Sequence, residues 1–446
     1  MSEAATRISP RDRDAILQAL RSGVVPRRGL QHVQVARSGE IGALVGDMKR
    51  IADGGSAIRF VIGHYGSGKS FLLSLTKAIA HKEGLVTLSA DLNPDRRLYG
   101  GSGQARSLYQ ELARNVATLT SPDGGAMASV LERFVTSAMQ QSKKTGEPVS
   151  AIIQDRLSRL SSLVNGFDFA TVVERYAAGA DQGNDRLKSD AIRWMRGEFT
   201  TKTDARNALG VRTMIDDDDF YDQLKLFAAF VREAGYAGAV VAMDELVNVY
   251  KIPSSVGRAG NYEQVLRILN DVLQGSAEGI GFIFGGTPET LSDARRGLFS
   301  YQALQSRLQE NSFAAQHGRT DFSGPVIRLA NLSPEDVYVL LGNLRRVFAS
   351  GTDMPPLPDE ALTAFLNHCN SRIGAAYFQT PRTTIRAFID MLSVLDQHRD
   401  LAWEDLIEKI DVAADEDVDQ LDDPDAPDEE TAAPATGDDE LASFRL

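Results

Sequence analysis

The segment that most constrains this chain reads Gly63-His64-Tyr65-Gly66-Ser67-Gly68-Lys69-Ser70 and fits the spacing G-x-x-x-x-G-K-[ST]. A β-branched and aromatic run, residues 59–62, leads into it, and an apolar helical pattern follows from Phe71 onward. Glycines let backbone N–H groups wrap a phosphate closely, and a helix start directs its positive end at an anion. We therefore predict a nucleotide-binding loop from Gly63 to Phe71, in which Lys69 reaches the β- and γ-phosphates and Ser70 binds Mg²⁺.

A second apolar run, Ala239–Met243, ends in Asp244 and Glu245. Alone, this pattern fits any buried strand with a polar end. It lies about 175 residues after the phosphate-binding segment, as expected for the Walker B strand of an ATPase. We expect Asp244 to orient Mg²⁺ and Glu245 to polarise the attacking water, which favours ATP hydrolysis over passive binding.

Polar residues follow the next predicted strand, Ile280–Phe284. Thr287 is placed to sense the γ-phosphate, and it fits equally well as the N-cap of the following helix. Of the arginines downstream, we select Arg307 as the candidate that reaches the γ-phosphate of a neighbouring subunit. An arginine on a solvated helix face is the commoner arrangement for any one of them.

Arg382 follows Thr380-Pro381 and falls in the first turn of a predicted helix. A cation there opposes the helix dipole, which costs roughly a few tenths of a kcal/mol. Such a placement favours an anion nearby, so we expect Arg382 to face the nucleotide phosphates. The alternative is an ordinary surface arginine.

The order of elements predicts an α/β fold with a parallel sheet. Expected strands cover residues 59–62, 85–90, 239–243 and 280–284, with helices at 103–116 and 262–273 and a helical insertion at about 120–215. Strand signals fade after about residue 325, and capped helices follow. We divide the chain into an N-terminal helix and loop at 1–38, an ATPase core at 39–325, a helical lid or winged-helix-like domain at 326–410, and a tail at 411–446.

The tail carries the whole charge imbalance of the chain. The net charge is −13, and residues 411–446 hold fourteen acidic residues and one arginine, which leaves 47 acidic and 47 basic residues in 1–410. With few large apolar residues, this segment cannot offset its ordering entropy, so we expect it to be disordered. It serves solubility, or it docks on a basic partner or competes with nucleic acid for a basic groove.

Composition also excludes several classes of protein. No apolar run approaches the ~20 residues of a membrane helix, and the N-terminus lacks the apolar region of a signal peptide. The single cysteine, Cys369, excludes an intramolecular disulfide and a cysteine-based zinc site, and the histidines show no H-x-x-x-H spacing. We expect a cytoplasmic protein with no membrane partner.

Together these motifs resemble an AAA+ P-loop ATPase, nearest the origin-recognition and STAND-related branch. Four segments, at 16–37, 60–73, 285–308 and 380–392, look more narrowly like the BrxD-like ATP-binding proteins of BREX phage defence. The resemblance covers roughly residues 9–400 and leaves the acidic tail outside. It implies that Val24, Val25 and Pro26 lie near the adenine.

The resemblance further implies ATP and Mg²⁺ as cofactors and a role in anti-phage defence within a multi-gene system. We expect a homo-oligomer that acts on double-stranded DNA, directly or through other proteins of the system. The alternative is a nucleotide-gated signalling or scaffold ATPase that binds a partner enzyme through the long insertion and does not act on DNA itself.

Overall fold

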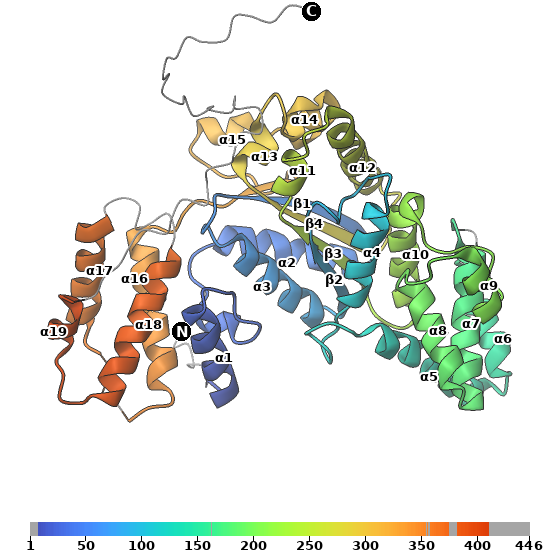
Figure 1. Ribbon diagram of the computed structural model, residues 1–446, viewed down its shortest axis with the longest axis horizontal. Coiled ribbons are helices and arrows are strands. Elements are labelled where there is room, and N and C mark those ends of the chain that lie inside the picture. The colour runs from blue at the N-terminus through green and yellow to red at the C-terminus, as the bar shows by residue number, and fades with distance from the viewer. Residues whose placement is uncertain (1–7, 162, 354, 356, 374–380, 410–446) are drawn as a thin grey trace, which may run out of the picture.

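The computed structural model describes residues 8–161, 163–353, 355, 357–373 and 381–409. Its centre is a sheet of five parallel strands in the order β2-β3-β4-β1-β5 (Figure 1). The strands are β1 (Ser56–Ile62), β2 (Leu85–Asp91), β3 (Gly238–Asp244), β4 (Ile280–Gly286) and β5 (Val326–Arg328). The predicted α/β fold with a parallel sheet is confirmed.

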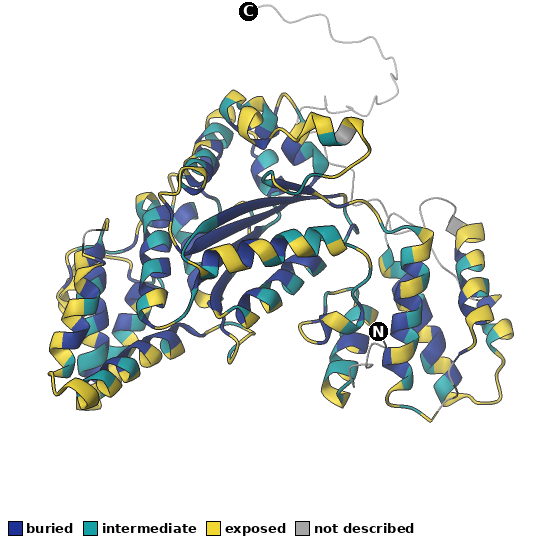
Figure 2. Ribbon diagram, turned by 180° about the vertical axis from the view of Figure 1, so that it is seen from behind, coloured by how far each residue is buried: buried dark blue, intermediate teal, exposed yellow. Residues whose placement is uncertain are grey.

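The sheet is covered on both faces, which explains why its strands are nearly continuous apolar runs. Side chains that point to one face pack with α2 (Ser38–Ala52) and α3 (Lys69–Lys82). Those on the other face pack with α4 (Gln104–Arg114), α10 (Phe220–Glu233) and α12 (Ser255–Leu273). In Figure 2 the strands are accordingly buried between partly exposed helices.

The predicted helical insertion is present as five helices on one side of the sheet (Figure 1). They are α5 (Met127–Thr145), α6 (Val149–Ser158), α7 (Gly166–Gln182), α8 (Asp185–Met195) and α9 (Lys202–Leu209). The insertion shares the core of the sheet's second face, where Phe134 and Phe169 pack on Phe230 of α10 at ring distances of 5.2 and 5.3 Å. The Asp217 carboxylate also accepts N–H groups of Gly103 and Arg106, which holds the end of the insertion to the start of α4.

A small helical layer lies beside the carboxyl ends of the strands. It contains α11 (Val247–Tyr250), α13 (Pro288–Ser292), α14 (Gln302–Leu308) and α15 (Ser312–Gln316). Short 3-10 turns occupy Leu30–His32, Asp217–Asp219 and Leu298–Ser300. The four helices follow β3 and β4 in the chain, and α14 carries the expected Arg307.

The lid is a separate helical unit with its own apolar core. It contains α16 (Pro334–Ala349), α17 (Asp359–Ile373), α18 (Pro381–Gln397) and α19 (Trp403–Ile407). Helix α1 (Pro10–Arg21) belongs to it as well, because Ile16 and Leu17 pack in the same core as Phe365 and Phe388. The described residues after Arg328 form helices and no strand, as expected of a helical lid.

Two expected boundaries change. The lid was expected from residue 326, but Val326–Arg328 form β5, which pairs with β1 and belongs to the sheet. The first lid helix, α16, begins at Pro334. Helix α12 begins at Ser255, about two turns before the predicted residue 262. The acidic tail at 411–446 lies outside the described residues.

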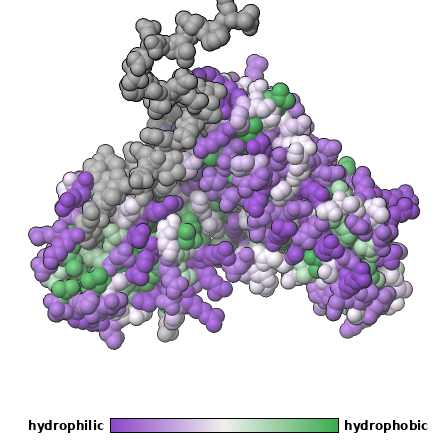
Figure 3. All heavy atoms as spheres, in the orientation of Figure 1, coloured by the Kyte–Doolittle hydropathy of each residue, from purple (hydrophilic) through white to green (hydrophobic). Residues whose placement is uncertain are grey.

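The face in Figure 3 is dominated by hydrophilic side chains. Among the described residues, no helix combines the length and the apolar character that crossing a membrane requires.

Candidate functional site

The predicted phosphate-binding loop joins β1 to α3. Gly66 and Gly68 have φ values of 76° and 89°, in the left-handed region that glycine adopts without strain. Helix α3 begins at Lys69, directly after the loop. The Lys69 ammonium donates hydrogen bonds to the carbonyl oxygens of Gly63 and His64 at 2.7 and 2.8 Å, so the lysine folds over its own loop.

Ser67 occupies the middle of this loop and is buried. Its hydroxyl oxygen has no hydrogen-bond partner among the described residues, and a Cβ on Gly63 would come within 2.4 Å of it. Gly63 is thus required by close packing across the loop. A buried hydroxyl without a partner beside two left-handed glycines is the type of polar cradle that holds a phosphate group.

Asp244 lies at the end of β3, where the sequence places it. Its Oδ2 accepts a hydrogen bond from the Ser70 hydroxyl at 3.0 Å, and its Oδ1 accepts the Glu245 backbone N–H at 2.9 Å. Gly285 of β4 makes room for this carboxylate, because a Cβ there would lie 2.1 Å from Oδ1. The two expected Mg²⁺ residues, Ser70 and Asp244, are therefore in direct contact.

Glu245 adopts a left-handed conformation, with φ of 59°, which costs a non-glycine residue about 1 kcal/mol. The backbone turns sharply here because the next N–H, of Leu246, donates to the Gly285 carbonyl oxygen at 2.9 Å. The turn leaves Glu245 in the wall of the cavity above the phosphate-binding loop. Burial raises the pKa of its carboxyl group and the nearby Asp244 adds to the rise, while Lys69 opposes it.

A third carboxylate, Asp91, stands beside this pair and was not predicted. It ends β2 in register with Asp244 of the neighbouring strand. Burial is the first cause that raises its pKa, and the Asp244 charge is the second. An acid at the end of the run Leu85–Ala90 was the available sequence signal.

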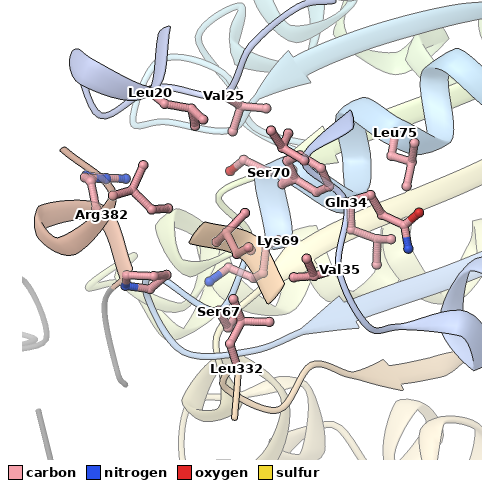
Figure 4. A pocket seen from close by; sticks show the side chains of 18 of the residues that line it. Leu20, Val25, Gln34, Val35, Ser67, Lys69, Ser70, Leu75, Leu332 and Arg382 are labelled. Carbon is pink, nitrogen blue, oxygen red and sulfur yellow. The ribbon is translucent and has the colours of Figure 1, made fainter. Parts of the chain in front are cut away.

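The cavity, of about 250 Å³, lies between the phosphate-binding loop and the lid (Figure 4). We call residues 22–37, which connect α1 to α2, the N-terminal strap; Val24 and Val25 of the strap line the cavity. Val33 and Val35 of the strap also line it, and the other apolar wall residues come from the core and the lid: Leu20, Ile41, Phe71, Leu75, Leu332, Leu340, Ile385. A polar loop at one end and apolar side chains around the remainder suit a nucleotide, with phosphates at the loop and a base among the apolar groups.

Arg382 also lines this cavity, from the first turn of α18 (Figure 4). Its side chain lies over Gly23 of the strap, where a Cβ would come within 3.0 Å of Cδ. It makes no ion pair or hydrogen bond with the residues that the structure describes. The guanidinium is therefore available to an anion that enters the cavity.

Thr287 and Arg307 are not part of the cavity wall. Thr287 is buried directly after β4 and is the N-cap residue of α13, as expected, although its side chain makes no capping hydrogen bond and its hydroxyl instead contacts the Thr290 hydroxyl at 3.0 Å. Arg307 is exposed on α14 and donates to the Ala303 carbonyl oxygen at 2.8 Å. Another downstream arginine, Arg296, is buried with its guanidinium 5.6 Å from the Tyr250 ring, which indicates a packing role.

Arg37 is the main residue that the sequence analysis missed. One of its terminal nitrogens donates to the carbonyl oxygens of Ser67 and Ala330, each at 2.7 Å. It thus joins the strap to the phosphate-binding loop and to the connection between β5 and the lid. Contacts that span 293 residues leave no local sequence signal.

The parallel sheet, the loop between β1 and α3, and the acidic end of β3 define a P-loop nucleoside triphosphatase fold. The family model for the BREX system ATP-binding protein BrxC/D matches residues 8–411. The chain belongs to this family and is therefore an ATP-binding component of a BREX defence system. No curated protein matches the chain.

Proposed function

We propose that this protein binds ATP with Mg²⁺ in the cavity beneath the lid and hydrolyses the ATP. The polar cradle of Gly63–Ser70 would hold the phosphates, and the contacting pair Ser70 and Asp244 would hold the metal. When bound, Mg²⁺–ATP supplies the phosphoanhydride bond and neutralises much of the phosphate charge. Val24 and Val25 would contact the base, and Lys69 would exchange its loop carbonyls for phosphate oxygens.

The observation that carries hydrolysis is the position of Glu245. It projects from a strained turn into the cavity wall, next to Asp244 and above the loop. Burial and the neighbouring Asp244 charge raise its pKa, which makes the carboxylate a stronger proton acceptor than an ordinary glutamate. We propose that Glu245 orients a water molecule and accepts its proton.

The remaining predicted residues would act in the nucleotide-bound assembly. Arg382 would engage the phosphates from the lid, and Thr287 would respond to the γ-phosphate at the end of β4. Arg307 is exposed and outside the cavity wall, so it would reach a phosphate only in a neighbouring copy of the chain. We therefore propose a homo-oligomer in which active sites lie between subunits.

Steady-state ATP hydrolysis with matched variants tests this proposal. Glu245→Gln should reduce kcat at least 100-fold, because it removes the proton acceptor. Glu263→Gln changes an exposed glutamate on α12 and should leave kcat unchanged. Equal rates for the two variants would refute a catalytic role for Glu245. A rate per molecule that rises steeply with protein concentration would support arginines that act between subunits.

We further propose that the ATPase acts on double-stranded DNA or on factors bound to it. Residues 1–410 carry equal numbers of acidic and basic residues, so the basic positions on the lid are the part of the chain that would contact DNA phosphates. Adding duplex DNA to the same assay should stimulate hydrolysis in a salt-sensitive manner. Unchanged rates, with no salt-sensitive DNA binding, would refute this part.

A nucleotide-gated partner switch is the second candidate, and one observation favours it. The connection between α6 and α7 exposes Leu163 and Val164, and Phe167 in the first turn of α7 is exposed as well. Exposed apolar side chains grouped in this way mark a protein contact site. Pull-downs of the neighbouring BREX proteins with the parent and with Phe167→Ser, each with and without ATP, would distinguish the two functions.

A further inference from the structure

Arginines gather on the lid at the mouth of the cavity. Arg382 and Arg386 lie one turn apart on α18, and Asp390 follows one turn later on the same face. Arg21 of α1 joins them, with its Nε 2.9 Å from the Asp390 carboxylate. We call Arg21, Arg382, Arg386 and Asp390 the mouth patch.

The mouth patch carries a net positive charge, because its three arginines face a single carboxylate, that of Asp390. Asp390 is its one acidic member and also lies 3.9 Å from the Arg386 Nε, so it serves two arginines at once. Arg382 has no charged partner among the described residues. Arg27 and Arg28, both exposed on the adjoining strap, extend the basic character, and Arg27 lies 3.6 Å from Asp123.

The chain itself carries a complementary segment. Residues 411–446 contain fourteen of the 61 acidic residues and a single arginine. They follow α19, which packs on α17 and α18 within the lid. Because 36 residues can span up to ~120 Å when extended, the acidic segment is long enough to reach the mouth patch.

From this complementarity we infer that the acidic tail docks on the mouth patch and competes with nucleotide phosphates for Arg382. The tail is tethered to the lid, so its effective concentration is in the millimolar range without any tight contact. Individual exposed ion pairs are weak, but many carboxylates share a few arginines here. Docking would hold Arg382 away from an entering nucleotide and weaken ATP binding until a partner removes the tail.

The effect on ATP rests on the proposed function, whereas the docking itself does not. If the tail occupies the patch for about nine tenths of the time, the apparent Kd for ATP rises about tenfold. A full-length variant with the fourteen tail acids replaced by Asn or Gln should then bind ATP about tenfold more tightly. Salt should reduce the difference, because the contact is between exposed charges.

Energy transfer between two fluorophores tests the docking directly. Gln18→Cys places one label on the exposed face of α1 near Arg21, and Ser443→Cys places the other in the tail. The natural Cys369 is fully buried and does not interfere with labelling. Transfer should be high at low salt and should fall in the variant with the neutral tail and on addition of a non-hydrolysable ATP analogue.

A matched pair of substitutions locates the contact. Arg386→Glu reverses a charge in the mouth patch and should reduce transfer, and Arg399→Glu reverses an exposed arginine beyond the other end of α18 and should not. Equal transfer in these two variants would overturn the inference, as would transfer that stays unchanged when the ATP analogue is bound. Unchanged transfer in Arg386→Glu with lost duplex-DNA binding would assign the patch to nucleic acid instead. If the chain binds no nucleotide but transfer still falls in Arg386→Glu, the proposed function and the competition with ATP are refuted. The docking of the tail on the mouth patch is then retained.

Discussion

Replacing Gly285 with alanine gives a sharp test of the geometry around Asp244. The new Cβ would lie 2.1 Å from the Asp244 Oδ1, whereas real Cβ contacts stay beyond 3.0 Å. The carboxylate therefore has to move by about 1 Å, which lengthens its contacts with the Ser70 hydroxyl and the Glu245 N–H, now 3.0 and 2.9 Å, beyond hydrogen-bond range.

The expected loss follows from that displacement. A misplacement of about 1 Å in a catalytic group lowers the rate ~100-fold, equivalent to ~2.7 kcal/mol of activation free energy. The assay is kcat for ATP hydrolysis over a range of Mg²⁺ concentrations, together with urea unfolding to confirm that the variant folds.

Gly286→Ala is the matched control for this prediction. It adds the same methyl group to the next residue of β4, where the nearest atoms are 3.4 Å away. We expect it to keep kcat within about twofold of the parent. A Gly285→Ala protein that is folded and as active as Gly286→Ala would refute the role assigned to Asp244.

Three further predictions concern other parts of the molecule. Asp47→Ala leaves the buried Arg59 without its carboxylate and should lower the free energy of unfolding by about 3–5 kcal/mol in urea, while exposed Asp53→Ala should change it by less than about 0.5 kcal/mol. Asp91→Asn removes a charge that raises the pKa of Glu245, so the acidic limb of the kcat–pH profile should move to lower pH; a shift upward would contradict this. Arg37→Gln should weaken ATP binding about tenfold in calorimetry, and an unchanged Kd would argue against its link between strap and loop.

Features encoded by neighbouring residues were predictable from the sequence. The loop at Gly63–Ser70 and the strand that ends at Asp244 depend on local spacing, and both occupy the expected elements. Capped helices were equally clear, since Ser333 and Asp336 form the reciprocal bonds of a capping box at the start of α16.

What the sequence did not predict depends on distant contacts. β5 is three residues long and is a strand because it pairs with β1, more than 260 residues earlier. Helix α1 joins the lid through apolar residues such as Ile16, whose partners lie more than 300 residues away. Arg37 reaches the site through loop geometry, which no local pattern records, and Asp91, although it ends a predicted strand, is brought beside Asp244 by the strand register.

Equilibrium binding of ATP with Mg²⁺ tests most directly whether the cavity beneath the lid is the nucleotide site. Lys69→Ala removes the ammonium that lies over the phosphate-binding loop, and Lys82→Ala removes an exposed ammonium at the end of the same helix. We predict that calorimetry will show at least tenfold weaker binding for Lys69→Ala and parent affinity for Lys82→Ala, since hydrogen bonds to charged groups contribute about 1.5–3 kcal/mol. Equal affinity in the two variants would contradict the account.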